Sequence, residues 1–364
     1  MSELVYPYAK HPEPGEVQEI APGVFWLTMP LQGSLDHINL YLLEDEDGWF
    51  VVDTGWGDAR TEDLWNQIFD SVTAAKGVKG VICTHMHPDH TGQALTVTNR
   101  FQCPLYMSQA EYYQARAFGS TVTDSHSSWH SKQFYHRAGM PEAFLSAMAE
   151  QRSHAGFTMP QIPAGYRRLQ DGDLLQIGAN EWMVVVGSGH SPEHVCLHCN
   201  HLGIMISGDQ ILPVITSNVS IHPNEPEANP MKAWLESHDR FLSTPEDTLI
   251  LPAHNLPFYG VRERLRELID HHEDRMLAIE EHCTEPSLAK DLLPVLFKRE
   301  LDPRQMMMAL GEAIAHLHLL MHRNRIERVL GCGERYWFRS IDPGLKRRLH
   351  PEAHAAPDDS PVMV

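Results

Sequence analysis

The sequence predicts an α/β fold in which short apolar strands end at histidine or aspartate. Several apolar runs of strand length are followed closely by one of these metal-binding residue types, and amphipathic helical stretches separate some of the runs. Because ligands in such folds bind beyond the carboxyl ends of strands, we expect these side chains to converge on one site. The runs occupy residues 50–52, 78–84, 182–186, 204–208 and 249–253.

The remaining elements follow from apolar patterning and turn residues. Residues 17–57 predict a meander of strands, because apolar stretches there are separated by turns rich in Gly, Pro and Asp. Residues 59–76 predict an amphipathic helix, since Leu64, Ile68 and Val72 fall on one face. Further helices are predicted at 91–100, 228–242 and 261–282, and an insertion at 110–165 is expected to cap the site.

A histidine-rich motif, Thr-His-Met-His-Pro-Asp-His-Thr-Gly, closes the second of these runs. In an extended segment His85 and His87 project to the same face, because side chains alternate with period two. The proline that follows ends the strand, so Asp89 and His90 approach from a second direction. Neutral imidazole and carboxylate suit a divalent metal such as zinc, and two adjacent metal positions are predicted. The alternative is a histidine-rich surface loop.

Four other strand ends agree with this motif. A Gly-Ser-Gly turn after the strand at 182–186 precedes His190, and the strand at 204–208 ends in glycine before Asp209. A further strand delivers His254, and the strand at 50–52 delivers Asp53. His194 follows His190 by four residues and is expected either to support the ligands or simply to pack in the core.

Taken in order, these residues resemble the pattern of the metallo-β-lactamase superfamily. The resemblance covers roughly residues 17–275 and is carried by Asp53-Thr-Gly, His85-x-His87-x-Asp89-His90, His190, Asp209 and His254. It implies a four-layer αβ/βα sandwich with metals at one edge of two facing sheets. The nearest variant is the glyoxalase-II-like and ribonuclease-like branch, because the true β-lactamases mostly place other residues at several of these positions.

The resemblance also implies a role for each residue. It implies two divalent ions, expected to be zinc, with iron or manganese as alternatives. The first ion would be bound by His85, His87 and His190, the second by Asp89, His90 and His254, and Asp209 would bridge both. Asp53 would support the metal-bound histidines from behind. Relatives that cleave thioesters typically carry glycine where this chain has Glu193, which puts the substrate in doubt more than the metals.

Two adjacent divalent ions can share a hydroxide whose pKa falls toward about 7, which supplies a nucleophile at neutral pH. Asp89 is expected to move the proton and Asp209 to fix the spacing of the ions. The expected reaction is hydrolysis of an ester, thioester or lactone-type acyl bond in a small molecule. His222, Asn255 and Tyr259 are candidates for substrate contact.

Two other activities stay open at this point. A persulfide dioxygenase of the same superfamily would use one iron bound by two histidines and an aspartate. A ribonuclease is suggested by residues 298–348, which hold eleven Lys or Arg against six Asp or Glu. The net charge of −19 over 364 residues argues against general affinity for nucleic acid, so only this basic region keeps that partner open.

The composition also bounds the organisation and location of the chain. Residues 1–283 are expected to form the catalytic domain and residues 284–349 a small winged-helix-like domain, with helices at 287–298 and 303–322 before two short strands. Residues 350–364 are expected to be disordered. No run of eighteen apolar residues and no signal-peptide pattern occur, so a cytoplasmic protein without a membrane partner is expected. A homodimer is an open alternative to a monomer.

Overall fold

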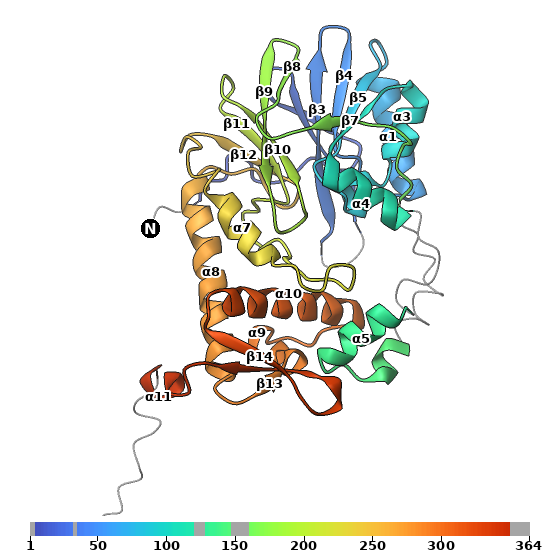
Figure 1. Cartoon of the computed structure of the whole chain (residues 1–364). Coiled ribbons are helices and arrows are strands. Elements are labelled where there is room, and N and C mark those ends of the chain that lie inside the picture. The colour runs from blue at the N-terminus through green and yellow to red at the C-terminus, as the bar shows by residue number, and fades with distance from the viewer. Residues whose placement is uncertain (1–3, 32–34, 120–127, 147–159, 350–364) are drawn as a thin grey trace, which may run out of the picture. The chain divides into compact units, whose positions relative to one another are not determined.

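The computed structural model describes residues 4–31, 35–119, 128–146 and 160–349. The chain divides into two compact units (Figure 1). The N-terminal unit comprises Met1–Ser125, Arg152–Val219 and Lys232–Asp270, and the C-terminal unit comprises His126–Gln151, Ser220–Met231 and His271–Val364. Part of the predicted insertion therefore belongs to the C-terminal unit. Whether the insertion caps the site stays a prediction.

A seven-stranded sheet forms the first half of the N-terminal unit, with its strands in sequence order. The first four strands are an antiparallel meander, as predicted, and the last four run parallel to one another. The strands are β1 (Val17–Ala21), β2 (Val24–Pro30), β3 (His37–Asp45), β4 (Gly48–Val52), β5 (Val78–Ile82), β6 (Leu105–Ser108) and β7 (Arg167–Leu169).

A five-stranded sheet forms the second half, in the order β12-β11-β10-β9-β8. Its pairs are antiparallel except for β11 and β12, which run parallel, so both deliver their carboxyl ends to the same edge. The strands are β8 (Leu174–Ile177), β9 (Asn180–Gly187), β10 (His194–Cys199), β11 (Ile204–Gly208) and β12 (Leu249–Pro252).

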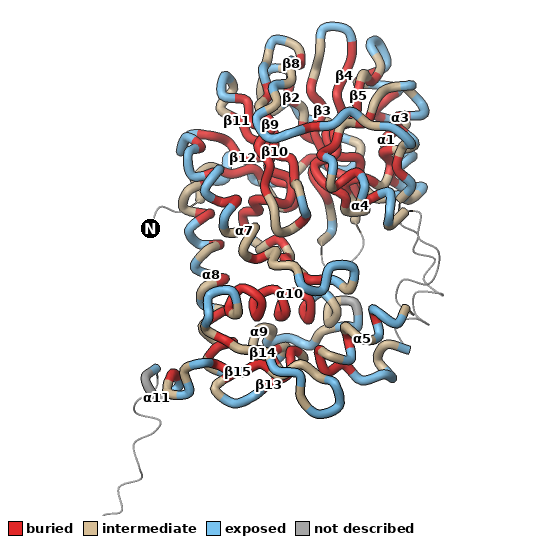
Figure 2. Tube along the Cα trace, viewed as in Figure 1, coloured by how far each residue is buried: buried red, intermediate tan, exposed pale blue. Residues whose placement is uncertain are grey.

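Alternation along the strands builds two cores in the N-terminal unit (Figure 2). Trp26 of β2 faces a core that lies between the two sheets and also contains Trp182 of β9. Leu27, the next residue, faces a second core that contains Trp65 of α1 (Ala59–Ser71). The second core also takes in α3 (Ala94–Phe101), so helices cover the outer side of the first sheet. Packing on both faces explains why strand residues are buried in long runs.

This unit also contains α4 (Gln109–Gly119), most of α7 (Pro230–His238) and the first part of α8 (Val261–His282), which continues into the C-terminal unit. Arg240, just after α7, donates from Nη1 to the carbonyl of Val186 in β9 at 2.9 Å, which ties α7 to the second sheet. Among the described helices, none combines the length and apolar character needed to cross a membrane.

The helix predicted at 91–100 is interrupted in the structure. A four-residue helix, α2 (Pro88–Thr91), lies within the histidine motif and contains Asp89 and His90, and α3 begins only at Ala94. The interruption lies at Gln93, whose φ of −109° and ψ of 9° are not helical, one residue after Gly92, where a Cβ atom would overlap the backbone of residues 55–57. The close approach of these two backbone segments explains why glycine stands at position 92, and the predicted helix is confirmed from Ala94 onward and wrong only at its start.

The C-terminal unit contains a three-stranded antiparallel sheet in the order β13-β15-β14, several helices and helical turns, and the end of α8. The strands are β13 (Ser287–Leu288), β14 (Ile326–Leu330) and β15 (Tyr336–Ser340); the helices are α5 (Trp129–Arg137), η1 (Ala289–Leu292), α9 (Leu293–Leu296), α10 (Pro303–His322) and α11 (Leu345–Leu349). A further turn, η2 (Cys332–Glu334), joins β14 to β15.

This sheet corrects the prediction of a helix at 287–298 beside a two-stranded wing. Ser287 and Leu288 are buried and pair with Phe338 and Trp337 of β15. These two residues therefore form a strand, and helical structure begins only at Ala289. The predicted winged helix stays a prediction, and so does the disorder of residues 350–364, which lie outside the described residues.

Replacement of Trp26 by alanine tests the shared core. Trp26 is fully buried, and its indole donates to Oδ1 of Asn39 at 2.9 Å. Trp26→Ala is expected to lower the free energy of unfolding by about 3–5 kcal/mol, because it leaves a cavity and an unpaired amide oxygen. Urea unfolding followed by circular dichroism measures the change. Trp129→Ala, at an indole that is 64% exposed, is the control, and equal losses in both variants would contradict the role of Trp26 in the core.

Candidate metal centre

The strand ends of the N-terminal unit bring the seven predicted ligands together. β5 leads into the His85–His90 motif, and the turn after β9 carries His190. Asp209 follows β11, and His254 follows β12 after one alanine. The side chains form two groups, each with its potential ligand atoms within 4.8 Å of one another: His85, His87, His190 and Asp209; and Asp89, His90 and His254.

In the first group, three imidazole nitrogens face one another. Nε2 of His85 lies 2.8 Å from Nδ1 of His87 and 3.2 Å from Nε2 of His190. The far nitrogen of His190 donates to the carbonyl of Asn218 at 2.8 Å, so its Nε2 is the lone-pair nitrogen in the neutral ring. Where two facing nitrogens both lack a proton, their lone pairs repel one another unless a cation lies between them.

In the second group, two imidazoles meet the carboxylate of Asp89, and Asp209 of the first group lies beside them. Nε2 of His254 lies 3.5 Å from Oδ2 of Asp89 and 3.4 Å from Oδ1 of Asp209. Nε2 of His90 lies 3.7 Å from the same two oxygens. The other oxygen of Asp209, Oδ2, lies 3.3 Å from Nε2 of His190 in the first group. Asp209 therefore presents one oxygen to each group.

Two buried atoms at the meeting point of the groups lack a hydrogen bond within the described part of the chain: Nε2 of His90 and Oδ1 of Asp209. A buried polar atom without a partner costs about 1–3 kcal/mol, so native proteins rarely leave two of them side by side. Imidazole nitrogen together with carboxylate oxygen is a donor set that suits zinc and related divalent ions. The residues present thus fit the metal ions that the sequence predicts.

Burial sets the protonation of the first group. It lowers the pKa of His87 to about 3 and moves the pKa of His85 well below its ordinary value, with repulsion between neighbouring imidazoles adding to the effect. Both rings are therefore neutral at physiological pH. Neutral imidazole is the form that binds a metal ion.

Asp53 holds the second group from behind, as the sequence predicts for a supporting residue. Its Oδ2 accepts from Nδ1 of His90 at 2.8 Å and from Oγ1 of Thr84 at 2.8 Å, and its Oδ1 accepts from the backbone N–H of Thr84 at 2.8 Å. The bond to Nδ1 fixes the tautomer of His90, so Nε2 faces the group. Asp53 has φ of 59°, a left-handed conformation that aspartate and asparagine tolerate better than most residues.

His194 supports Asp209 through the backbone. Its Nε2 accepts from the N–H of Asp209 at 3.1 Å, and its ring stacks on His85 with centroids 4.7 Å apart. Gly208 makes room for this ring, since a Cβ atom there would lie 2.6 Å from Cε1 of His194, and its φ of 50° also favours glycine. Of the two roles considered for His194, support of a ligand is the one that this geometry fits.

Glu111 is a residue that sequence reasoning missed. This buried carboxylate of α4 accepts from the backbone N–H of Met86 at 3.0 Å and from that of Glu193 at 2.8 Å. Met86 lies between His85 and His87, and Glu193 follows His190 by three residues, so one side chain joins the two segments that carry the first group. A single acidic residue near the start of a helix gives no signal of such a role.

Glu193, which departs from the resemblance, serves the same region. Its Oε2 accepts from the N–H of Ala110 at 2.9 Å, and its backbone carbonyl accepts from Oγ of Ser108 at 2.7 Å. Both contacts lie at the start of α4, the helix that carries Glu111. The side chain of Glu193 thus joins the start of α4 to the His190 loop.

The three candidate substrate residues lie in different settings. Asn255 has φ of 68° and its carbonyl accepts from Nδ2 of Asn39 at 2.7 Å, next to His254. Tyr259 is partly buried against the core shared by the two sheets. His222 is exposed and belongs to the C-terminal unit. A role in substrate contact stays a prediction for all three.

Comparison with known proteins decides the family. The sequence profile described as Metallo-beta-lactamase superfamily matches residues 33–254, and the profile described as Metallo-beta-lactamase-like, C-terminal domain matches residues 276–341. The chain belongs to the metallo-β-lactamase superfamily. A crystal structure of a beta-lactamase domain protein from Burkholderia ambifaria is similar to this superfamily member at 40% identity and a TM-score of 0.85, covering 93% of this chain and 98% of that one. The predicted fold class is confirmed.

Several curated relatives of this superfamily member are named as hydrolases or thioesterases. It is 23% identical over 215 residues to the acyl-coenzyme A thioesterase MBLAC2 of Bos taurus, which covers 53% of this chain and 65% of that protein. It is 24% identical over 150 residues to a hydroxyacylglutathione hydrolase of Maricaulis maris, which covers 41% of this chain and 56% of that protein. The match thus spans less than two thirds of these relatives. The prediction of a metal-dependent hydrolase is confirmed at the level of the superfamily.

Replacement of Asp53 by asparagine tests its hold on His90. Asparagine keeps the left-handed backbone but puts a neutral amide where a carboxylate accepts three hydrogen bonds. Asp53→Asn is expected to weaken metal binding by about 10–100-fold, because the Nε2 face of His90 is no longer fixed. Competition with a chelator measures the change. The control is Asp58→Asn at the N-cap of α1, since asparagine caps helices as well as aspartate does.

Replacement of Glu111 by glutamine tests the join between the two loops. One of the two backbone N–H groups would face an amide NH₂ instead of an oxygen, so Glu111→Gln is expected to lower the free energy of unfolding by about 1–3 kcal/mol. The metal affinity should fall with it. Glu62→Gln on the exposed side of α1 is the matched control. Unchanged stability and unchanged metal affinity in Glu111→Gln would refute the positioning role.

Proposed function

We propose that this protein hydrolyses thioester bonds of small acyl compounds at a dinuclear metal centre, with zinc as the expected metal. The observation that carries the proposal is the position of Asp209, whose two oxygens face two separate groups of imidazole nitrogens. A carboxylate placed in this way is suited to bridge two ions. The first ion would be held by His85, His87 and His190, and the second by Asp89, His90 and His254.

The names of the curated relatives favour one type of bond among those that the sequence predicts. An acyl-coenzyme A thioesterase and a hydroxyacylglutathione hydrolase both remove an acyl group that is carried on a thiol compound. Within the predicted class of esters, thioesters and lactones, this supports the thioester. Because the matches are distant and cover only part of these relatives, the thiol carrier is left open between coenzyme A, glutathione and smaller thiols.

The protein groups have distinct tasks in this reaction. Two bound divalent ions would lower the pKa of a water molecule and polarise the acyl carbonyl. The side chain of Asp89 is 18% exposed and that of Asp209 is 10% exposed, so Asp89 is the carboxylate more open to solvent. Asp89 is suited to take a proton from the attacking water and to deliver it to the leaving sulfur. Asp53 and Glu111 keep the imidazoles in place during these transfers.

The two other activities are less well supported. A mononuclear iron dioxygenase needs two histidines and one aspartate, and it would leave the group of Asp89, His90 and His254 without a task. A ribonuclease needs free basic side chains, yet several arginines of the C-terminal region form ion pairs with glutamates of the same unit: Arg323 with Glu273, Arg325 with Glu280, Arg328 with Glu227 and Arg339 with Glu327.

Metal analysis combined with a substrate panel tests the proposal. The purified protein should contain two zinc equivalents per chain and should cleave short acyl thioesters of coenzyme A or glutathione faster than oxygen esters, lactones or phosphodiesters. One iron per chain together with oxygen uptake on a persulfide would indicate the dioxygenase instead. Phosphodiester cleavage that weakens steeply with salt would indicate the ribonuclease.

Two variants test the residues of the centre. Asp89→Ala is expected to lower kcat by at least about a hundredfold, since it removes the proton carrier, and His87→Ala should abolish turnover and reduce the metal content. Far-UV circular dichroism should show both variants folded. Asp63→Ala and His201→Ala change exposed residues and serve as controls. Turnover at the wild-type rate in Asp89→Ala or His87→Ala would contradict the roles assigned to these residues.

A further inference from the structure

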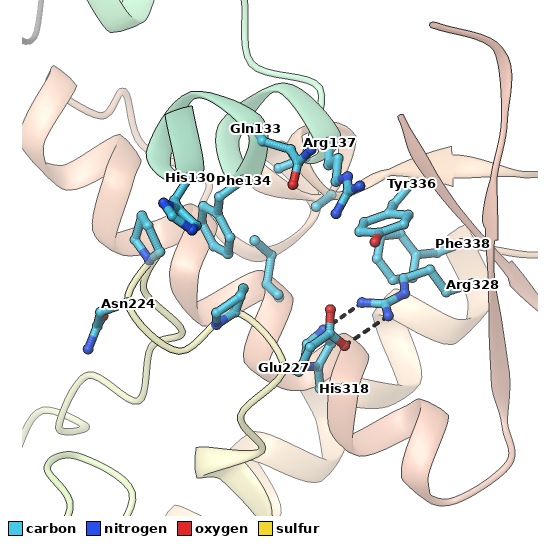
Figure 3. A pocket seen from close by; sticks show the side chains of 15 residues that line it. His130, Gln133, Phe134, Arg137, Asn224, Glu227, His318, Arg328, Tyr336 and Phe338 are labelled. Carbon is cyan, nitrogen blue, oxygen red and sulfur yellow. Dashed lines mark hydrogen bonds and ion pairs between the residues drawn. The ribbon is translucent and has the colours of Figure 1, made fainter. Parts of the chain in front are cut away.

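A cavity of about 170 Å³ lies within the C-terminal unit, and its walls belong entirely to that unit (Figure 3). Side chains of α5, of the segment 223–227, of α10 and of the strands β14 and β15 line it. The proposed hydrolysis uses none of them. The lining combines aromatic rings with two arginines, Arg137 and Arg328, in a chain whose net charge is −19.

Both arginines stack on the same tyrosine. Cζ of Arg137 lies 4.9 Å and Cζ of Arg328 lies 4.3 Å from the centroid of the Tyr336 ring. Stacking engages the flat face of a guanidinium and leaves the N–H groups at its edge free to donate. Tyr336 therefore orients two cationic groups without using their hydrogen bonds.

The charge of Arg328 is already compensated. Its Nη2 lies 2.9 Å from Oε2 of Glu227, and its Nη1 lies 3.5 Å from Nε2 of His318. His318 donates from Nδ1 to the carbonyl of Ala228 at 2.8 Å, and burial lowers its pKa, so its Nε2 is a neutral acceptor. Arg328 is thus fixed by an acid and a base of its own unit.

Arg137 has no such partner. Within the described ranges, its guanidinium makes no ion pair and no hydrogen bond, and its Nε atom is buried without an acceptor. A buried donor of a charged group is costly when it is left unpaired. Arg137 thus offers the cavity one uncompensated positive charge and a planar set of donors that matches a carboxylate.

The size and walls of the cavity define the rest of the ligand. Phe134, Phe338 and Ile314 supply apolar surface beside Tyr336. An apolar cavity of about 150 Å³ takes up one benzene molecule, so a volume of about 170 Å³ suits a single ring with a small charged group.

We propose that this cavity binds a small aromatic carboxylate. The carboxylate pairs with the free edge of the Arg137 guanidinium, and the ring lies against Phe134, Tyr336 and Phe338. None of the lining residues belongs to the metal centre, so binding of the carboxylate does not depend on the thioester activity.

Titration of the full-length protein with benzoate, followed calorimetrically, tests the proposal. Wild-type protein should bind benzoate, and it should bind benzyl alcohol and inorganic phosphate at least tenfold more weakly, because each lacks either the charge or the ring. Arg137→Met should weaken benzoate binding at least tenfold. Arg137→Lys should fall between wild type and Arg137→Met, since it keeps the charge but loses the planar donors. Arg299→Met, at an exposed arginine of the same unit outside the cavity, should bind as wild type does.

The Arg137 variants distinguish binding in this cavity from binding at the metal centre. Benzoate bound at the metal centre would be indifferent to Arg137, so equal affinities of wild type and Arg137→Met would overturn the proposal. Absence of benzoate binding to the folded wild-type protein at millimolar concentration would do the same. Phenyl phosphate that binds more tightly than benzoate would overturn the assignment of a carboxylate.

Discussion

The N-terminal unit is organised around a constraint at one sheet edge: nitrogens and oxygens that face one another without bonding. The ring nitrogens of His90, His190 and His254 lie between 3.3 and 3.7 Å from the oxygens of Asp209, too far apart for normal hydrogen bonds in most pairs and too close to leave room for an intervening water. Such an arrangement is costly in the absence of cations. The surrounding structure must hold these groups in place, and much of the chain near the site does so.

Three buried residues carry that task, each through a different kind of contact. Asp53 accepts from a histidine side chain, His194 accepts from the backbone of Asp209, and Glu111 accepts from the backbones of two loops. The strands bring the ligands to one edge, and these contacts hold the loops and side chains there, together with the bonds from Nδ1 of His190 and Nδ1 of His254 to backbone carbonyls. Packing of the two cores supplies the rigidity, because Trp26 and Trp182 join the two sheets.

The sequence predicted much of this arrangement because the informative signals are local. The His-x-His-x-Asp-His motif is contiguous, and an apolar run that ends in His or Asp can be seen in a short window. A prediction that failed depends on a long-range contact: Ser287 joins a sheet because β15 lies beside it. Glu111 was missed for the same reason, since its partners lie 25 and 82 residues away.

The two bonds that Glu111 accepts determine how this part of the protein tolerates change. Both donors are main-chain amides, which every amino acid except proline supplies, whereas the pair of acceptor oxygens exists only while residue 111 carries a carboxylate. Position 86 is therefore free to drift among side chains of suitable size without loss of its half of the contact. The contact therefore depends on the side chain at position 111 alone, and the residues around it in α4 give no sign of this role in the sequence.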